Sequence, residues 1–187
     1  MPTALTKRLL YTRPDGGVGV VALTPWCHRA LTCGGGWLSH VGTTAAREAA
    51  KAEARGCDPG IEHRFATALE SGGCSDAEAW GLIRDHDLPA DAGAAELIEF
   101  SELPDRWFRD AWGRSHNGGP IVVRLDKARA IQRQRISDAA SEEDARRKRL
   151  WLPPVPLDLG GLSIAIDRAR DAAELRAIWP REVPKAP

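Results

Sequence analysis

The sequence predicts an α+β protein with a small, mostly antiparallel sheet and helices packed on it. Three observations lead to this fold class: a turn-rich hairpin near the N-terminus, two later apolar runs of strand length, and several stretches with helical spacing. The 187 residues are 43% hydrophobic and 28% charged. This composition is that of a globular protein, and it argues against wholesale disorder, a collagen or a coiled-coil rod.

The sheet is predicted from a hairpin plus two strands. Strands are expected at 7–12 and 18–23, because the apolar runs Leu9–Thr12 and Val18–Leu23 flank Arg13–Gly17, which reads Arg-Pro-Asp-Gly-Gly. Proline presets φ, and the Asp-Gly-Gly sequence accommodates positive φ, so these residues favour a tight turn. The other two strands are expected at 95–100 and 121–125.

The residues between the second and third strands predict a loop followed by a helical insert. We expect a loop at 24–42, because Pro25 and the triplet Gly34–Gly36 interrupt it. Three short helices are then expected within 43–87, and Ser75 with Glu78 forms a capping box for the last of them.

A short helix over 104–112 is predicted to carry an apolar face that covers the sheet as a lid. Its apolar residues are Trp107, Phe108, Ala111 and Trp112. A long helix then begins at a cap on Asp126 and runs to about Leu150.

The prolines within 151–156 must end this long helix. Short helices are expected at about 162–170 and after a cap at Asp171, followed by a disordered or extended tail at 181–187. We therefore expect an α+β domain over 1–150 with its helical insert, and a Pro-rich linker with short C-terminal helices over 151–187.

The cysteines raise the question of a metal site. Cys27, Cys33, Cys57 and Cys74 all lie in the first 74 residues, so a zinc-dependent module is one alternative. Structural zinc sites usually contain two close ligand pairs, which this spacing does not supply. We therefore expect reduced thiols and assign no metal ligands and no cofactor.

Two histidine motifs could carry catalysis, but each has a simpler interpretation. Asp85-His86-Asp87 lies where a solvated helix end is expected, and Ser115-His116 precedes a Gly-rich turn. No phosphate-binding loop and no nucleophile elbow occur in the sequence. We therefore assign no catalytic residues and expect a protein that is not an enzyme.

The long helix carries the most distinctive polar pattern. Basic residues crowd its start, acidic residues follow, and Arg146–Arg149 close it. Such alternation is typical of an exposed helix or an inter-subunit contact. A nucleic-acid-binding regulator that uses the basic segment 124–136 is a second alternative, with Arg129, Arg133 and Arg135 as its phosphate ligands. The formal net charge of zero argues against a protein that coats nucleic acid.

Three segments also resemble one family. They are YTRPDGGV at 11–18, LPDRWFRDAW at 103–112 and VVRLDKARAIQRQRI at 122–136. They look like small proteins encoded by phages and prophages of alphaproteobacteria, often near tail genes. The resemblance carries over no catalytic residues.

This resemblance implies a phage-derived structural or assembly protein that acts through protein–protein contacts. Its partners would be virion or tail components or a second copy of itself, with Trp107 and Trp112 among the contact residues. We expect it in the bacterial cytoplasm or the virion, because no apolar run has the length of a signal peptide or a membrane span.

Overall fold

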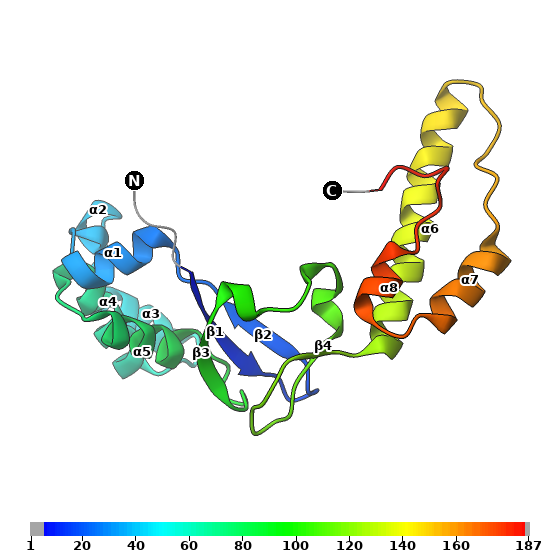
Figure 1. The fold of residues 1–187 in the computed structure, drawn as a ribbon. Helices are drawn as coiled ribbons and strands as arrows, with labels where there is room; N and C mark the ends of the chain where they lie inside the picture. The colour runs from blue at the N-terminus through cyan, green and yellow to red at the C-terminus, as the bar shows by residue number, and fades with distance from the viewer. Residues whose placement is uncertain (1–5, 186–187) are drawn as a thin grey trace. The chain divides into compact units, whose positions relative to one another are not determined.

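The computed structural model describes residues 6–185 and confirms the α+β class (Figure 1). The chain folds into two compact units. Unit 1 contains the residues up to Glu102 together with Ser115–Gly118, and unit 2 contains Leu103–Arg114 and the residues from Gly119 on. This packing groups the long helix with the C-terminal helices. The sequence predicts a domain over 1–150 and a separate C-terminal segment over 151–187, and this division stays a prediction.

The sheet of unit 1 contains the predicted hairpin and the predicted third strand. Strand β1 (Lys7–Thr12) lies between β2 (Val18–Val21) and β3 (Ala95–Glu99), and both pairings are antiparallel. The turn closes where the amide of Arg13 donates to the carbonyl of Gly17 at 2.8 Å. The Pro-Asp-Gly-Gly signal therefore located the hairpin correctly.

The prediction that 121–125 joins this sheet is wrong. Within that range the strand is β5 (Val122–Val123), which pairs with β4 (Trp112–Gly113) in a separate two-stranded sheet. The next residues cannot extend β5, because the amide of Arg124 donates to the carbonyl of Ala111 and the long helix begins at Leu125.

Five helices follow the hairpin in unit 1, including the three that were predicted within 43–87. They are α1 (Pro25–Cys33), α2 (Trp37–His40), α3 (Ala45–Ala54), α4 (Pro59–Ser71) and α5 (Asp76–Asp87). The capping box at Ser75 is confirmed, since its hydroxyl accepts from the Glu78 amide while the Glu78 carboxylate accepts from the Ser75 amide.

The expected loop at 24–42 is wrong, because α1 and α2 occupy most of it. The Thr24 hydroxyl accepts from the amide of Cys27 at 3.1 Å, and Pro25 sits in the first turn, where its fixed φ suits a helix. The glycines that suggested a loop end α1 and separate it from α2.

The core of unit 1 lies between the sheet and these helices. Leu9 of β1 packs with Leu31 of α1, Leu69 of α4 and Trp80 of α5. Each of these side chains is less than a tenth exposed. The insert is therefore an integral layer on the sheet (Figure 1).

Unit 2 is built around α6 (Leu125–Arg149), with α7 (Leu159–Arg168) and α8 (Ala172–Ala177) beside it (Figure 1). The predicted helix at 104–112 is a 3₁₀ helix, η2 (Arg106–Ala111). Its Trp107 and Phe108 share a core with α6, α7 and α8, so the prediction of a lid on the sheet is wrong.

Two further details differ from expectation at the ends of unit 2. The N-cap of α6 is Arg124, and the expected cap Asp126 lies in the first turn, where its charge still suits the helix dipole. The tail was expected to be disordered or extended, but residues 181–183 turn back on unit 2: Val183 is 3% exposed, and its carbonyl accepts from the Trp179 indole at 2.9 Å. Residues 186–187 lie outside the described part.

Candidate interaction site

The two tryptophans expected at a contact surface lie in the interior of unit 2. Trp107 is 8% exposed and Trp112 is 2% exposed. The Trp107 indole donates to Oε1 of Gln132 at 2.8 Å, and the Trp112 indole donates to the carbonyl of Asp105 at 3.3 Å. Both residues therefore hold the unit together, and this burial argues against a direct contact with a partner.

The three arginines expected to bind phosphate make contacts inside unit 2. Arg129 donates to the carbonyl of Ala169 at 2.9 Å, and Arg133 pairs with Asp167 of α7 at 2.5 Å. The guanidinium of Arg135 lies 4.4 Å from the centre of the Trp107 ring, which is a cation–π geometry. All three arginines therefore contribute to the packing of unit 2.

The cysteines do not assemble a metal site in the described residues. Among residues 6–185, no three His, Cys, Asp or Glu side chains lie close enough together to hold an ion. All four thiols are free, and burial together with the nearby Asp87 carboxylate raises the pKa of Cys27 to about 11. The structure therefore gives the zinc alternative no support.

His86 has a role that the sequence did not indicate. Its Nδ1 lies 2.6 Å from Asp87 and its Nε2 lies 3.0 Å from Glu62 of α4, while its ring stacks on Phe65 with 4.1 Å between centroids. Hydrogen bonding to Asp87 raises the pKa of His86, burial opposes this effect, and the Glu62 carboxylate reinforces it. Both ring nitrogens are occupied, so His86 ties α4 to α5.

The Ser115-His116 motif is a backbone element of unit 1. The carbonyl of Ser115 accepts from the hydroxyl of Thr12 at 3.1 Å, and the carbonyl of His116 accepts from the amide of Ala94 at 3.0 Å. These bonds attach the segment to the ends of β1 and β3.

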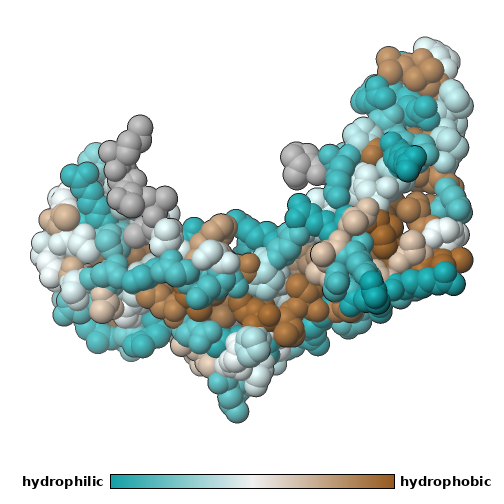
Figure 2. All heavy atoms as spheres, in the orientation of Figure 1, coloured by the Kyte–Doolittle hydropathy of each residue, from teal (hydrophilic) through white to brown (hydrophobic). Residues whose placement is uncertain are grey.

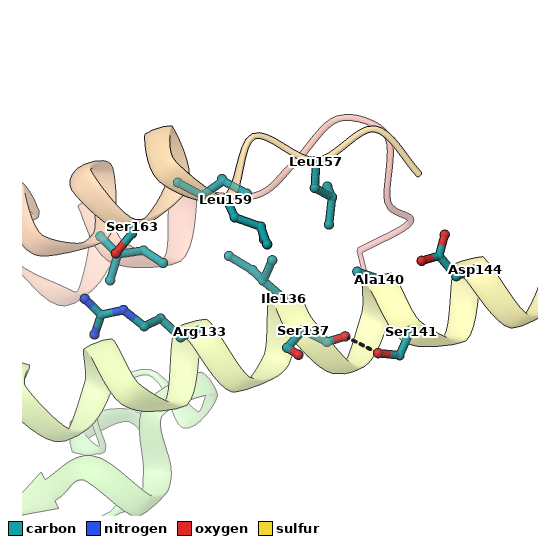
Figure 3. A pocket seen from close by; sticks show the side chains of 11 residues that line it. Arg133, Ile136, Ser137, Ala140, Ser141, Asp144, Leu157, Leu159 and Ser163 are labelled. Carbon is teal, nitrogen blue, oxygen red and sulfur yellow. Dashed lines mark hydrogen bonds between the residues drawn. The ribbon is translucent and has the colours of Figure 1, made fainter. Parts of the chain in front are cut away.

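An apolar groove runs between α6 and the segment that leads into α7. Figure 3 shows Leu157 and Leu159 pointing across it toward Ile136 and Ala140 of α6. The groove has a volume of about 320 Å³. Its lining residues are Arg133, Ile136, Ser137, Ala140, Ser141, Asp144, Leu157, Leu159, Leu162, Ser163 and Ile166.

The groove is open to solvent along its apolar wall. Leu159 is 67% exposed, although its side chain faces other apolar groups. Asp144 stands at the end of the groove nearest the C-terminus of α6 and accepts from the amide of Val155 at 2.7 Å. Most of the Leu159 surface is therefore left in contact with solvent along the wall of the groove.

A second exposed apolar feature follows the end of α6. We call Leu150–Leu152 the tip. Leu150 is 55% exposed, Trp151 is 96% exposed and Leu152 is 47% exposed. Figure 2 shows hydrophobic atoms gathered at this end of the helix, with hydrophilic atoms beside them. Trp151 has a φ of +57°, which few non-glycine residues adopt.

The tip is flanked by basic side chains. Glu143 binds Arg146 through two hydrogen bonds of 2.7 Å and lies 3.7 Å from Arg147. Lys148 and Arg149 have no ion pair among residues 6–185. The tip is therefore an apolar knob with two unneutralised positive charges beside it.

Sequence reasoning treated the residues of the tip only as the end of a helix. The one available signal was Leu-Trp-Leu between a basic run and two prolines, where no helical face could bury it. The groove had no signal, because its two walls are separated by the loop at 150–158 and meet only after α7 folds back on α6.

Comparison with protein-family models, with curated proteins and with solved structures finds no match to this chain. Across residues 6–185, none of the helices combines the length and the apolar character that crossing a bilayer requires. The candidate site therefore rests on the geometry of unit 2 alone.

Proposed function

We propose that this is a phage-derived structural or assembly protein that is not an enzyme and acts through protein–protein contacts made by unit 2. The observation that carries the proposal is the exposed apolar surface of the tip and groove. Apolar groups this large are normally buried, and contiguous exposure of them is typical of surfaces that bind other proteins.

Two further points support this function. The histidine motifs at 85–87 and 115–116 are engaged in helix packing and backbone contacts. The family resemblance carried by YTRPDGGV, FRDAW and the basic helix supports a phage or prophage origin, with virion or tail components or a second copy as partners.

Affinity capture from the bacterium that carries the gene tests this proposal. A tagged wild-type chain, produced while the prophage is induced, is expected to co-purify with virion or tail proteins. The Trp151→Ala variant should capture less of them, whereas Trp26→Ala, a half-exposed tryptophan of unit 1, should behave as the wild type. Recovery of the wild-type chain alone, as a monomer, contradicts the proposal.

A further inference from the structure

Unit 2 carries an exposed apolar knob and an exposed apolar groove at different places on its surface. The tip holds a 96% exposed tryptophan, so the groove of the same chain does not contain it. We infer that copies of this protein assemble head to tail, with the tip of one copy seated in the groove of the next. This inference rests on the proposed function, which it deepens by naming a second copy as the partner.

The size of the groove fits the side chain that the tip would insert. A cavity of about 150 Å³ is large enough to hold benzene. The groove has about 320 Å³, so it has room for an indole with part of a neighbouring leucine. Trp151 would bury its ring against Leu157, Leu159 and Ile136, and a rigid ring loses little conformational entropy on binding.

The charges beside the two surfaces have opposite signs. Lys148 and Arg149 flank the tip. Asp144 lines the groove, and Asp158 stands between two leucines of its wall, where it caps α7 through the amide of Gly161. Arg133 also lines the groove, but its charge is paired with Asp167 of α7. Neither carboxylate has an ion pair with a cation among the described residues. Docking the tip would bring the two cations toward these two carboxylates, which favours this orientation over one that joins two tips.

A contact of this kind is heterologous, because different surfaces of each copy meet. A chain of copies then keeps a free tip at one end and a free groove at the other, so assembly stops only when a ring closes and otherwise continues as a filament. Such an open-ended contact suits a protein that builds or lines a repeating structure.

An anionic lipid surface is the competing occupant of the tip, since tryptophan, leucine and basic residues also favour membrane interfaces. We favour the second copy, because a lipid surface would bind the tip and leave the exposed leucines of the groove uncovered. A second copy carries both surfaces, so it accounts for the groove and the tip together.

Mixing two variants tests the heterologous contact directly. Trp151→Ala removes the tip and leaves the groove, whereas Leu159→Lys keeps the tip and places a charge in the groove that repels Lys148 and Arg149. Both sites are largely exposed, so both variants should fold. Ile164→Lys, a 54% exposed site on α7 outside the groove lining, is the matched control.

Sedimentation velocity gives the readout. The wild type, Ile164→Lys and Trp26→Ala are expected to form a concentration-dependent series of oligomers. Each test variant alone should be monomeric, and an equimolar mixture of the two should form dimers and nothing larger, because one intact tip and one intact groove remain per pair. If circular dichroism shows that Leu159→Lys does not fold, Ser141→Arg on the exposed side of α6 replaces it.

Three results would overturn the inference. The first is a wild-type chain that stays monomeric at all concentrations, and the second is a mixture of folded variants that forms no dimer. The third is binding of a monomeric wild type to phosphatidylserine vesicles that Trp151→Ala abolishes, which would assign the tip to a lipid surface. A chain that fails here yet captures tail proteins keeps the proposed function and loses only self-assembly.

Discussion

The indole of Trp107 donates its N–H to Oε1 of Gln132 across 2.8 Å in the interior of unit 2. Gln132 is fully buried, and its Nε2 donates to the carbonyl of Ile178 at 2.7 Å. The side-chain amide of Gln132, which belongs to α6, therefore hydrogen-bonds one polar group of η2 and one of the segment after α8. Buried polar networks of this kind fix how elements meet, because every alternative leaves a group without a partner.

Replacing this amide should destabilise unit 2 strongly. Gln132→Leu leaves the buried Trp107 N–H and the part-buried Ile178 carbonyl without this partner, at up to about 1–3 kcal/mol for each group. We expect a loss of about 2–4 kcal/mol in the free energy of unfolding, measured by urea denaturation. Gln134→Leu, on the exposed side of the same helix, should change stability by less than about 0.5 kcal/mol. Equal losses in the two variants would contradict this account.

Gly72 should tolerate no side chain, because it meets Gly34 where α4 and α1 end. An added Cβ on Gly72 would lie 1.9 Å from the Gly34 nitrogen, and the φ of Gly72 is +68°. We expect Gly72→Ala to cost roughly 2–4 kcal/mol through overpacking and backbone strain. Gly56→Ala has a similar φ of +76° and open space for a Cβ, so it isolates the strain, about 1–2 kcal/mol. Similar melting temperatures for the two variants would show that the close contact is absent.

His86 should make the stability of unit 1 depend on pH. The folded state raises the pKa of His86 above its ordinary 6.5, so protonated His86 stabilises the fold. That contribution is complete below pH 6.5 and is lost as the pH rises through the higher folded pKa. Thermal unfolding across this window should therefore show His86→Gln losing most stability at acidic pH and little at alkaline pH. The exposed His63→Gln is the control, and a pH-independent difference for His86→Gln would refute the coupling.

The four cysteines should react at two different rates. Cys33 and Cys57 are exposed, whereas burial raises the pKa of both Cys27 and Cys74. Because the thiolate is the reactive form, we expect two thiols to react quickly with a disulfide reagent at neutral pH and two to react slowly. Mass spectrometry of the labelled peptides identifies them. Rapid labelling of Cys27 in the folded chain would contradict its assigned surroundings.

Elements encoded by neighbouring residues could be predicted from the sequence. The turn at Arg13–Gly17 and the capping box at Ser75 depend on residues within five positions, and both occur as expected. The helix starting at Pro25 also has a local signal in its N-cap Thr24, but the loop prediction rested on Pro25 and the glycines alone.

Contacts between distant residues could not be predicted in the same way. The apolar face of Trp107 and Phe108 was recognised, but nothing local says that it covers α6. Likewise the spacing of Arg129 and Arg133 was visible, while their partners in and beyond α7 lie more than 30 residues away. Whether such an arginine is available to bind nucleic acid depends on which distant residues pack against it, and its neighbours in the sequence do not show this.

Mass spectrometry of purified phage particles from an induced lysogen tests the central claim most directly. A structural or assembly protein that works through unit 2 should be present in the particles, and a prophage carrying Trp151→Ala should yield fewer complete particles. The account is contradicted if the chain is absent from the particles and a strain lacking its gene releases normal particles in normal numbers.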